Sequence, residues 1–148
     1  MGIKSSIKKK YFIMKKIIIL IFSIGIFSSC SNDDDNSLNS EILGEWKLVE
    51  AQILNFGGQS STNYSNENII YNFLSSEILK VTGGQNIGYP TREYEYFFGE
   101  DYLGGGTTDP KILLVKINGS KWTYNLTNGK MKLGKSYVDG PDLILERK

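Results

Sequence analysis

The sequence has no histidine and a single cysteine, Cys30, among its 148 residues. Nucleophilic centres of the Ser-His-Asp and Cys-His types need an imidazole, and zinc sites and haem irons are mostly held by histidine or cysteine. The composition therefore excludes these centres. Catalysis would have to use carboxylates, lysine, tyrosine or serine, and no spacing of such residues identifies a catalytic set. We expect a protein that is not an enzyme and that uses no cofactor and no metal.

Acidic residues are absent from residues 1–29, which hold six lysines and carry a net charge of +6. The remaining residues hold 11 basic and 16 acidic groups and carry a net charge of −5. Since nucleic-acid binding depends on basic patches, and none lies outside the first 29 residues, we expect no nucleic-acid partner.

Long hydrophobic runs are also scarce, because the uncharged run from Ile17 to Ser29, which contains the apolar segment, has only 13 residues. A membrane-spanning helix needs about 20. Lys15 and Lys16 followed by 11 apolar residues are instead typical of a secretory signal peptide. Met14-Lys15-Lys16 is typical of the start of such a leader, and the sequence leaves open whether the chain starts at Met1 or at Met14.

The signal peptide ends in Phe27-Ser28-Ser29-Cys30, which resembles a bacterial lipobox. The resemblance implies that residues 1–29 are removed and that Cys30 is lipidated, giving a membrane anchor. Two or more acyl chains hold a protein stably on a membrane. The alternative is a buried structural cysteine.

Residues 30–40 carry Asp33-Asp34-Asp35 and form a predicted acidic, flexible tether. An acidic stretch directly after the lipidated cysteine resembles the surface-export signal of Bacteroidota-type lipoproteins. The resemblance implies an outer-membrane protein that faces the cell exterior. The alternative is an ordinary solvated linker.

Residues 41–148 form the predicted domain, and short alternating runs separated by glycine and Asn-Gly turns indicate an all-β fold. We expect long loops at 55–68, 83–90 and 99–110. Eight strands are predicted, at 45–54, 69–74, 78–82, 92–98, 111–117, 121–126, 130–135 and 143–147. Eight sequential antiparallel strands can close into an up-and-down β-barrel without free edges. A two-sheet sandwich fits the same pattern.

The domain opens with Leu43-Gly44-Glu45-Trp46, which resembles the Gly-x-Trp opening of lipocalins. Residues 70–83, 128–133 and 145–147 are similar to later strands of lipocalin-like bacterial lipoproteins, so the resemblance covers 42–148. It implies an eight-stranded lipocalin-like barrel with a ligand cavity. It also implies that Arg147, at the end of the last strand, lies across Trp46.

Strand parity predicts which side chains face the barrel interior. Nine residues are the candidate ligand-binding set: Trp46, Tyr71, Phe73, Arg92, Tyr94, Tyr96, Phe98, Trp122 and Tyr124. Arg92 would bind a ligand carboxylate, and Glu50 shares the inward parity. The alternatives are an ordinary core and, for these two charges, a strand end in water or a bulge that reverses the faces.

Two further expectations follow from the parity. The buried hydroxyls of Tyr94, Tyr96 and Tyr124 need partners, which we expect to be water, one another or a ligand. The opposite face should be exposed, which concerns Glu93, Glu95, Lys121 and Thr123.

Two functions remain open from the sequence. The first is a lipid-anchored surface protein that binds a small apolar or amphipathic ligand. The second is a filled barrel that acts as a protein-interaction or inhibitor-like module of the outer membrane. An open, tyrosine-lined cavity favours the first, and a filled interior with apolar loop tips favours the second. The sequence does not determine the oligomeric state.

Overall fold

The structure, a computed structural model, describes residues 40–84, 87–104, 106 and 108–148. The predicted signal peptide, Cys30 and all of the tether before Ser40 lie outside these residues, so lipidation and surface export stay predictions. In the described part of the chain, no helix is both long and apolar enough to cross a membrane.

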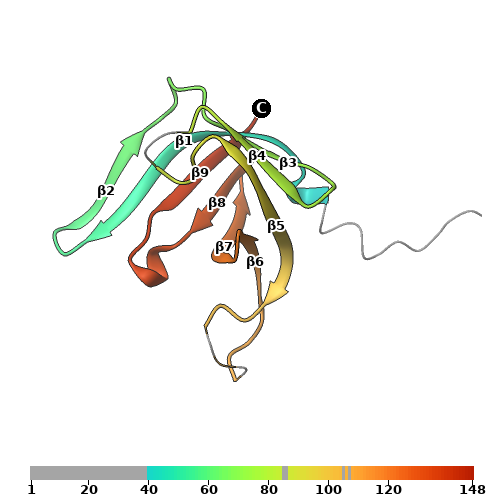
Figure 1. The fold of residues 1–148 in the computed structure, drawn as a ribbon. Coiled ribbons are helices and arrows are strands. Elements are labelled where there is room, and N and C mark those ends of the chain that lie inside the picture. Colours follow the sequence, from blue (N-terminus) through green and yellow to red (C-terminus); the bar gives the residue numbers. More distant parts are fainter. Residues whose placement is uncertain (1–39, 85–86, 105, 107) are drawn as a thin grey trace, which may run out of the picture. The chain divides into compact units, whose positions relative to one another are not determined.

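The described part of the domain consists of helical residues 40–42, nine antiparallel strands and one short 3-10 helix. They are β1 (Gly44–Asn55), β2 (Gly58–Asn63), β3 (Ile70–Phe73), β4 (Ile78–Thr82), β5 (Arg92–Asp101), β6 (Ile112–Ile117), β7 (Ser120–Thr127), β8 (Lys130–Gly134), η1 (Ser136–Val138) and β9 (Asp142–Arg147). The strand order is β2-β1-β3-β4-β5-β6-β7-β8-β9, and β9 pairs back onto β1 (Figure 1). Eight strands therefore form a closed up-and-down barrel, which confirms the predicted fold and excludes the sandwich.

Two hairpins have the predicted Asn-Gly turns, between β6 and β7 and between β7 and β8. Asn118 and Gly119 have φ values of 48° and 79°, and Asn128 and Gly129 have 53° and 75°. Positive φ at both central residues is the type I′ geometry, which matches the twist of the flanking strands. These local signals fix the order of three consecutive strands.

The barrel closes where the first and last strands meet. Trp46 lies opposite Arg147 in the β1–β9 register, and the guanidinium carbon is 4.3 Å from the centroid of the tryptophan ring. Arg147 also donates hydrogen bonds to the carbonyls of Leu43 (3.0 Å) and Glu41 (2.8 Å). The predicted stacking of Arg147 on Trp46 is confirmed.

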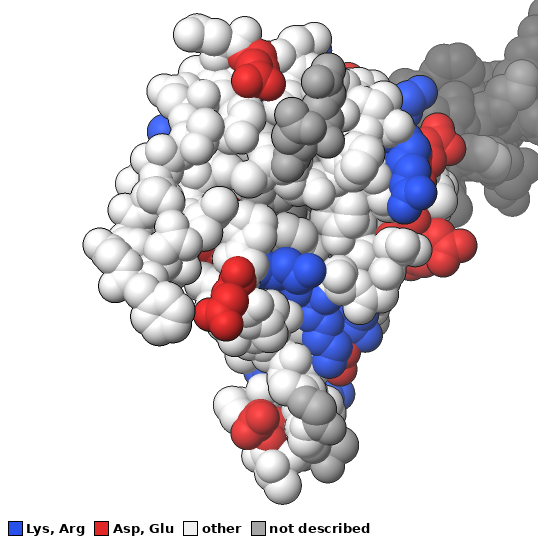
Figure 2. Space-filling model, turned by 60° about the vertical axis from the view of Figure 1, so that its left-hand side comes forward, with Lys and Arg blue, Asp and Glu red and all other residues white. Residues whose placement is uncertain are grey.

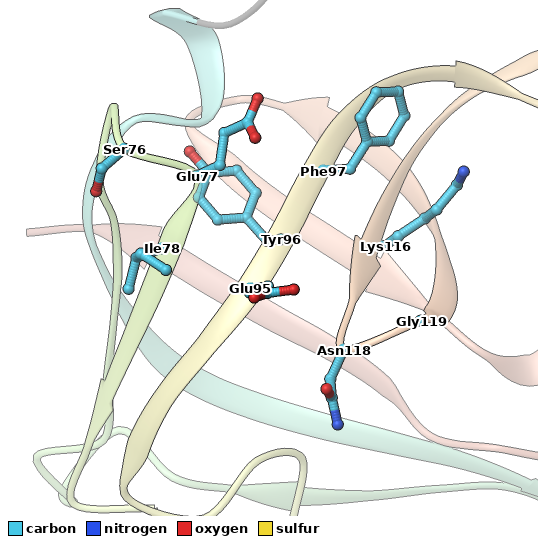
Figure 3. Close-up of a pocket in the computed structure, with 9 residues that line it drawn as sticks. All are labelled: Ser76, Glu77, Ile78, Glu95, Tyr96, Phe97, Lys116, Asn118 and Gly119. Atoms are coloured by element: carbon cyan, nitrogen blue, oxygen red, sulfur yellow. The ribbon is translucent and has the colours of Figure 1, made fainter.

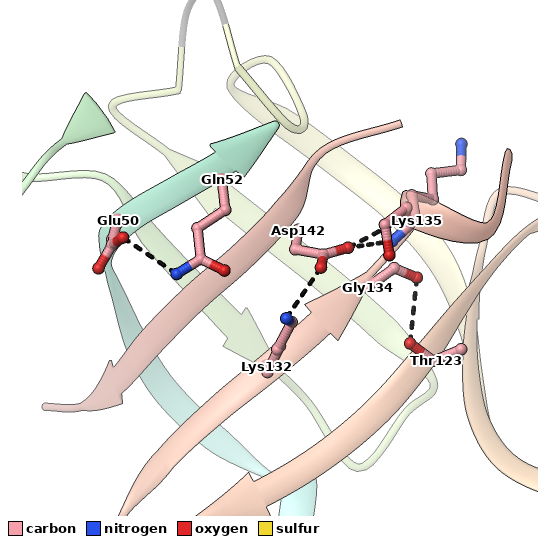
Figure 4. Close-up of polar contacts among 8 residues, drawn as sticks. Glu50, Gln52, Thr123, Lys132, Gly134, Lys135 and Asp142 are labelled. Carbon is pink, nitrogen blue, oxygen red and sulfur yellow. Dashed lines mark hydrogen bonds and ion pairs between the residues drawn. The ribbon is translucent and has the colours of Figure 1, made fainter. Parts of the chain in front are cut away.

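A β-bulge in β1 changes which side chains face inward. The register against β9 shifts between Leu48 and Glu50, so Leu48 and Ala51 are both buried in the core. Glu50 points outward and accepts a hydrogen bond from Nε2 of Gln52 at 3.0 Å (Figure 4). The inward parity expected for Glu50 is wrong, because the extra residue reverses the alternation.

The expected loop at 55–68 is partly wrong, because it contains β2. Glu50–Asn55 of β1 pairs with β2 through a two-residue turn, Phe56-Gly57, whereas Gly44–Lys47 of β1 pairs with β3. Every residue of β2 is exposed, so the strand has no buried face to produce an apolar alternation. The β1–β2 hairpin projects beyond the barrel (Figure 1).

Candidate functional site: the barrel interior and the projecting hairpin

The barrel interior is filled by its own side chains. Eight of the nine candidate ligand-binding residues, all except Arg92, belong to the core or pack against it. Trp46, Tyr71, Leu79, Met131 and Leu133 have no surface accessible to water, so no water-sized space adjoins them. The sequence predicted these positions correctly as inward-facing. Their assigned role in binding a ligand stays a prediction.

One end of the barrel is covered by the helical residues 40–42, which precede β1. Ile42 is fully buried in the core, and its carbonyl accepts a hydrogen bond from Nε1 of Trp46 at 2.7 Å. The same helical residues supply the Glu41 carbonyl that Arg147 binds. Ile42 therefore fills part of this end of the barrel, beside a hollow of about 390 Å³ that Leu43, Tyr96 and Phe98 help to line.

The opposite end is closed by the β4–β5 loop, where Tyr89 lies over the core. Its hydroxyl accepts a hydrogen bond from Nε1 of Trp122 (3.0 Å) and donates to the Ile117 carbonyl (3.1 Å), and its backbone N–H donates to the Tyr71 hydroxyl (3.0 Å). Gly88 has φ of 70°, and a Cβ there would lie 2.3 Å from the Tyr71 hydroxyl. Only glycine allows this close approach. Burial raises the pKa of Tyr71 to about 12.

The tyrosine hydroxyls have different partners from those expected. Tyr94 donates to the carbonyl of Pro90 and Tyr96 to that of Leu74, each at 2.8 Å. The Tyr124 hydroxyl is buried and has no hydrogen bond of normal geometry among the described residues. Burial, followed by the nearby Glu41 carboxylate, raises the pKa of Tyr124. Two of the three tyrosine hydroxyls therefore donate their hydrogen bonds to backbone carbonyls and not to another tyrosine.

Arg92 lies outside the interior although its parity is inward. It is exposed at the start of β5, and its guanidinium carbon lies 4.5 Å from the centroid of the Tyr94 ring. Arg92 therefore lies at a strand end in water, which is one of the alternatives to an inward position. Glu93 and Glu95 are exposed as predicted, but Lys121 and Thr123 are half-buried. The prediction that Lys121 and Thr123 are exposed is therefore wrong. The Lys121 ammonium lies 3.6 Å from the Asp101 carboxylate, and the Thr123 hydroxyl donates a hydrogen bond to the Gly134 carbonyl at 3.3 Å.

A groove of about 450 Å³ crosses the outer face of β5 (Figure 3). Its charged groups include Glu77, Glu95 and Lys116, and Figure 3 shows that the two carboxylates do not point toward one another. Lys116 is already paired with Asp101 at 2.7 Å and lies 4.8 Å from the centroid of the Phe97 ring. The bond from Lys116 lowers the pKa of Asp101 to about 2. Lys116 is therefore engaged by Asp101 and Phe97.

Asp142 organises the loop before β9 (Figure 4). Its carboxylate accepts hydrogen bonds from the backbone N–H groups of Lys135 (2.8 Å) and Ser136 (3.0 Å) and pairs with Lys132 at 2.9 Å. Burial raises the pKa of Asp142, but these bonds outweigh burial and leave the pKa below its ordinary value. All its partners are structural. In the described ranges, no group of three or more acidic or sulfur ligands could hold a metal ion.

The tip of the β1–β2 hairpin exposes large apolar side chains. Leu54 is 59% exposed and Phe56 is fully exposed. Together with Asn55 and Asp139 they line a pocket of about 450 Å³, so the hairpin lies beside the turn after η1. We call these four residues the tip surface. Figure 2, in which the hairpin side is turned forward, shows a broad area with few charged residues.

Comparison of the chain with protein-family models, curated proteins and solved structures found no match.

Sequence reasoning missed Ile42, Tyr89 and the tip surface. Tyr89 lies in a predicted loop, and its position directly before Pro90 was the only local sign of order. Leu54 was included in a predicted strand, but nothing in the alternation showed that this strand runs beyond the barrel.

Proposed function

We propose that the protein is a lipid-anchored outer-membrane protein, of the lipocalin-like kind, that binds a partner protein through its tip surface. The contrast between a filled interior and an apolar projecting hairpin carries the proposal. A small-molecule carrier needs a pocket that encloses its ligand, whereas large apolar side chains gathered on a surface are typical of protein interfaces. Leu54 and Phe56 are such side chains.

The lining of the tip surface defines the chemistry of the partner. Leu54 and Phe56 would pack against an apolar side chain, the kind of anchor that dominates binding energy at interfaces. The exposed carboxylate of Asp139, in the same pocket, would pair with a lysine or arginine beside that anchor. The expected partner therefore presents an apolar residue next to a basic one.

The direction of β1 favours a partner protein over the anchoring membrane. The described residues begin at Ser40, just before β1, and the tip surface lies at the far end of this 12-residue strand. A strand of that length spans about 40 Å. An anchor at Cys30 would therefore join the domain at the end away from the tip surface.

Photo-crosslinking on whole host cells tests the proposal. A photoreactive amino acid replaces Phe56 in the full chain, and the matched control places it at Asn125, which is exposed on β7. We expect a discrete protein adduct from position 56 only. When Leu54→Ser and Asp139→Asn are added to the chain with the photoreactive residue at position 56, the yield of the adduct should fall at least several-fold.

Two outcomes would contradict the proposal. Adducts with lipid alone would assign the tip surface to the membrane. A small molecule retained by the purified protein in native mass spectrometry, together with no adduct, would favour the carrier function. Membrane release of a Cys30→Ala chain tests the anchor separately.

A further inference from the structure

The outer edge of β2 has no neighbouring strand among the described residues. β2 pairs with β1 along one edge only and lies at the end of the strand order. Figure 1 shows β2 at the margin of the sheet. This edge is separate from the tip surface, so an inference about it goes beyond the proposed function.

The register determines which peptide groups face this edge. The N–H of Tyr64 donates a hydrogen bond to the carbonyl of Val49 at 2.8 Å, so the peptide group of Tyr64 faces β1. In an antiparallel pair, successive residues alternate between bonding toward the partner strand and facing away. The peptide groups of Gln59, Ser61 and Asn63 therefore point away from β1. Three donors and three acceptors form an open row.

Within the ranges that the structure describes, the β2 edge has none of the usual protections of an edge strand. Proteins normally protect free edges with lysine, proline, a bulge or a covering segment, because an open row of peptide groups pairs with other strands. Residues 51–66 contain no charged residue and no proline. The edge is therefore suited to pairing with another strand. Because residues 51–66 carry no charged side chain, two identical strands can pair there without charge repulsion.

The order of side chains along β2 indicates what pairs with it. Residues 59–63 read Gln-Ser-Ser-Thr-Asn, an amide, three hydroxyls and an amide. This chemical order is the same in both directions, with Ser61 at its centre. An antiparallel strand of the same sequence would place amide opposite amide and hydroxyl opposite hydroxyl, pairs that hydrogen-bond across a sheet.

We infer that the β2 edge binds a second copy of this chain, antiparallel and with the two-fold axis at Ser61. Ser61 of each copy exchanges both backbone hydrogen bonds with Ser61 of the other, and Gln59 of each faces Asn63 of the other. The two hairpins form one continuous four-stranded sheet, β1-β2-β2-β1. A two-fold contact of one surface with itself is the commonest arrangement in homodimers.

A cysteine substitution tests the pairing. In an antiparallel hydrogen-bonded pair the two Cα atoms lie about 5.5 Å apart, within the range that a disulfide bridges. Ser61→Cys in the full chain should therefore form a disulfide dimer under mild oxidation. Thr127→Cys, an exposed position in the β7–β8 hairpin, is the matched control. The unsubstituted chain reports any dimer that forms through Cys30.

A second pair of variants tests the hydrogen bonds. Ser61→Pro removes an N–H that faces the open edge and leaves the bonds to β1 intact, whereas Ser61→Ala keeps the N–H. Sedimentation velocity of the full chain in detergent, over a concentration series, should show a monomer–dimer equilibrium. Ser61→Pro should raise its dissociation constant at least tenfold, and Ser61→Ala should change it less than threefold.

Several results would overturn the inference. A chain that stays monomeric over the series, with no more Ser61→Cys dimer than Thr127→Cys dimer, excludes the pairing. Equal dimerisation of Ser61→Pro and the unsubstituted chain, with unchanged near-ultraviolet circular dichroism, assigns the dimer to another surface. A position-56 adduct with a different protein in a strictly monomeric chain overturns this inference and leaves the proposed function standing.

Discussion

At the scale of single residues, two tyrosines on neighbouring parts of the core differ in whether their hydroxyl is bonded. The Tyr96 hydroxyl donates to the Leu74 carbonyl, whereas that of Tyr124 has no partner of normal geometry in the described part of the chain. Tyr96→Phe should lower the free energy of unfolding by about 1 kcal/mol, and Tyr124→Phe should leave it unchanged or raise it. Urea unfolding of the two variants checks this contrast, and equal losses would contradict it.

Ionisation of the Asp142 carboxylate makes the free energy of unfolding depend on pH. Its pKa is lower in the folded protein than its ordinary value, so its contribution is complete above about pH 4 and is lost as the pH falls through the folded pKa. Asp142→Asn should cost about 1–3 kcal/mol at neutral pH, because bonds from a charged acceptor to Lys135 and Ser136 weaken. The difference in unfolding free energy between the variant and the parent should therefore become smaller as the pH falls from 7 to 3. A constant difference over this range would be contrary to the expectation.

At the scale of elements, turn residues with positive φ determine the hairpins. Gly129 has φ of 75°, while Gly57 is not in that region and has open space around its Cβ position. Gly129→Ala should therefore destabilise the protein by about 1–2 kcal/mol, and Gly57→Ala should change stability by less than about 0.5 kcal/mol. Thermal unfolding monitored by tryptophan fluorescence compares the two. A larger loss for Gly57→Ala would show that the β1–β2 turn carries an undetected constraint.

Element prediction succeeded where a strand has one buried face. Tyr94, Tyr96 and Phe98 alternate with polar neighbours in β5, and the fold follows that alternation. β2 could not be found in this way, because both of its faces are exposed and only its pairing with β1 makes it a strand. The bulge at Val49 was equally hidden, since it arises from the register against β9, a strand that lies about a hundred residues later in the chain.

For the candidate site too, local sequence patterns predicted some features and long-range packing determined the others. Parity predicted the inward aromatic residues, but it does not tell a lined cavity from a filled core. That difference depends on packing volume and on Ile42 and Tyr89, which enter from segments outside the strands. The tip surface depends on how far β1 extends beyond its neighbours, a property of pairing lengths and not of any local pattern.

At the scale of the whole barrel, interior and exterior aromatic residues should respond differently to truncation. Phe73 is 1% exposed and packs edge-on against Tyr96 at 5.0 Å between ring centroids, whereas Phe97 lies on the outer face and is 41% exposed. Phe73→Ala should cost about 3–5 kcal/mol, and Phe97→Ala about 1 kcal/mol or less. Guanidinium unfolding measures both. A loss under about 1 kcal/mol for Phe73→Ala would indicate unfilled space in the interior and would favour a ligand cavity.

The contact between β1 and β9 also determines when the molecule can fold. β1 is the first strand of the barrel to be synthesised and β9 the last, so the closing pair of Trp46 and Arg147 cannot form until the final strand is available. Contacts so distant along the chain make folding slow, since the loop must close before they stabilise it. The barrel therefore stays open while β9 is still missing, whatever the first eight strands have already paired with. Export of the chain during its synthesis, as the predicted signal peptide would direct, would deliver this open form, and a test is whether a chain that lacks β9 stays unfolded.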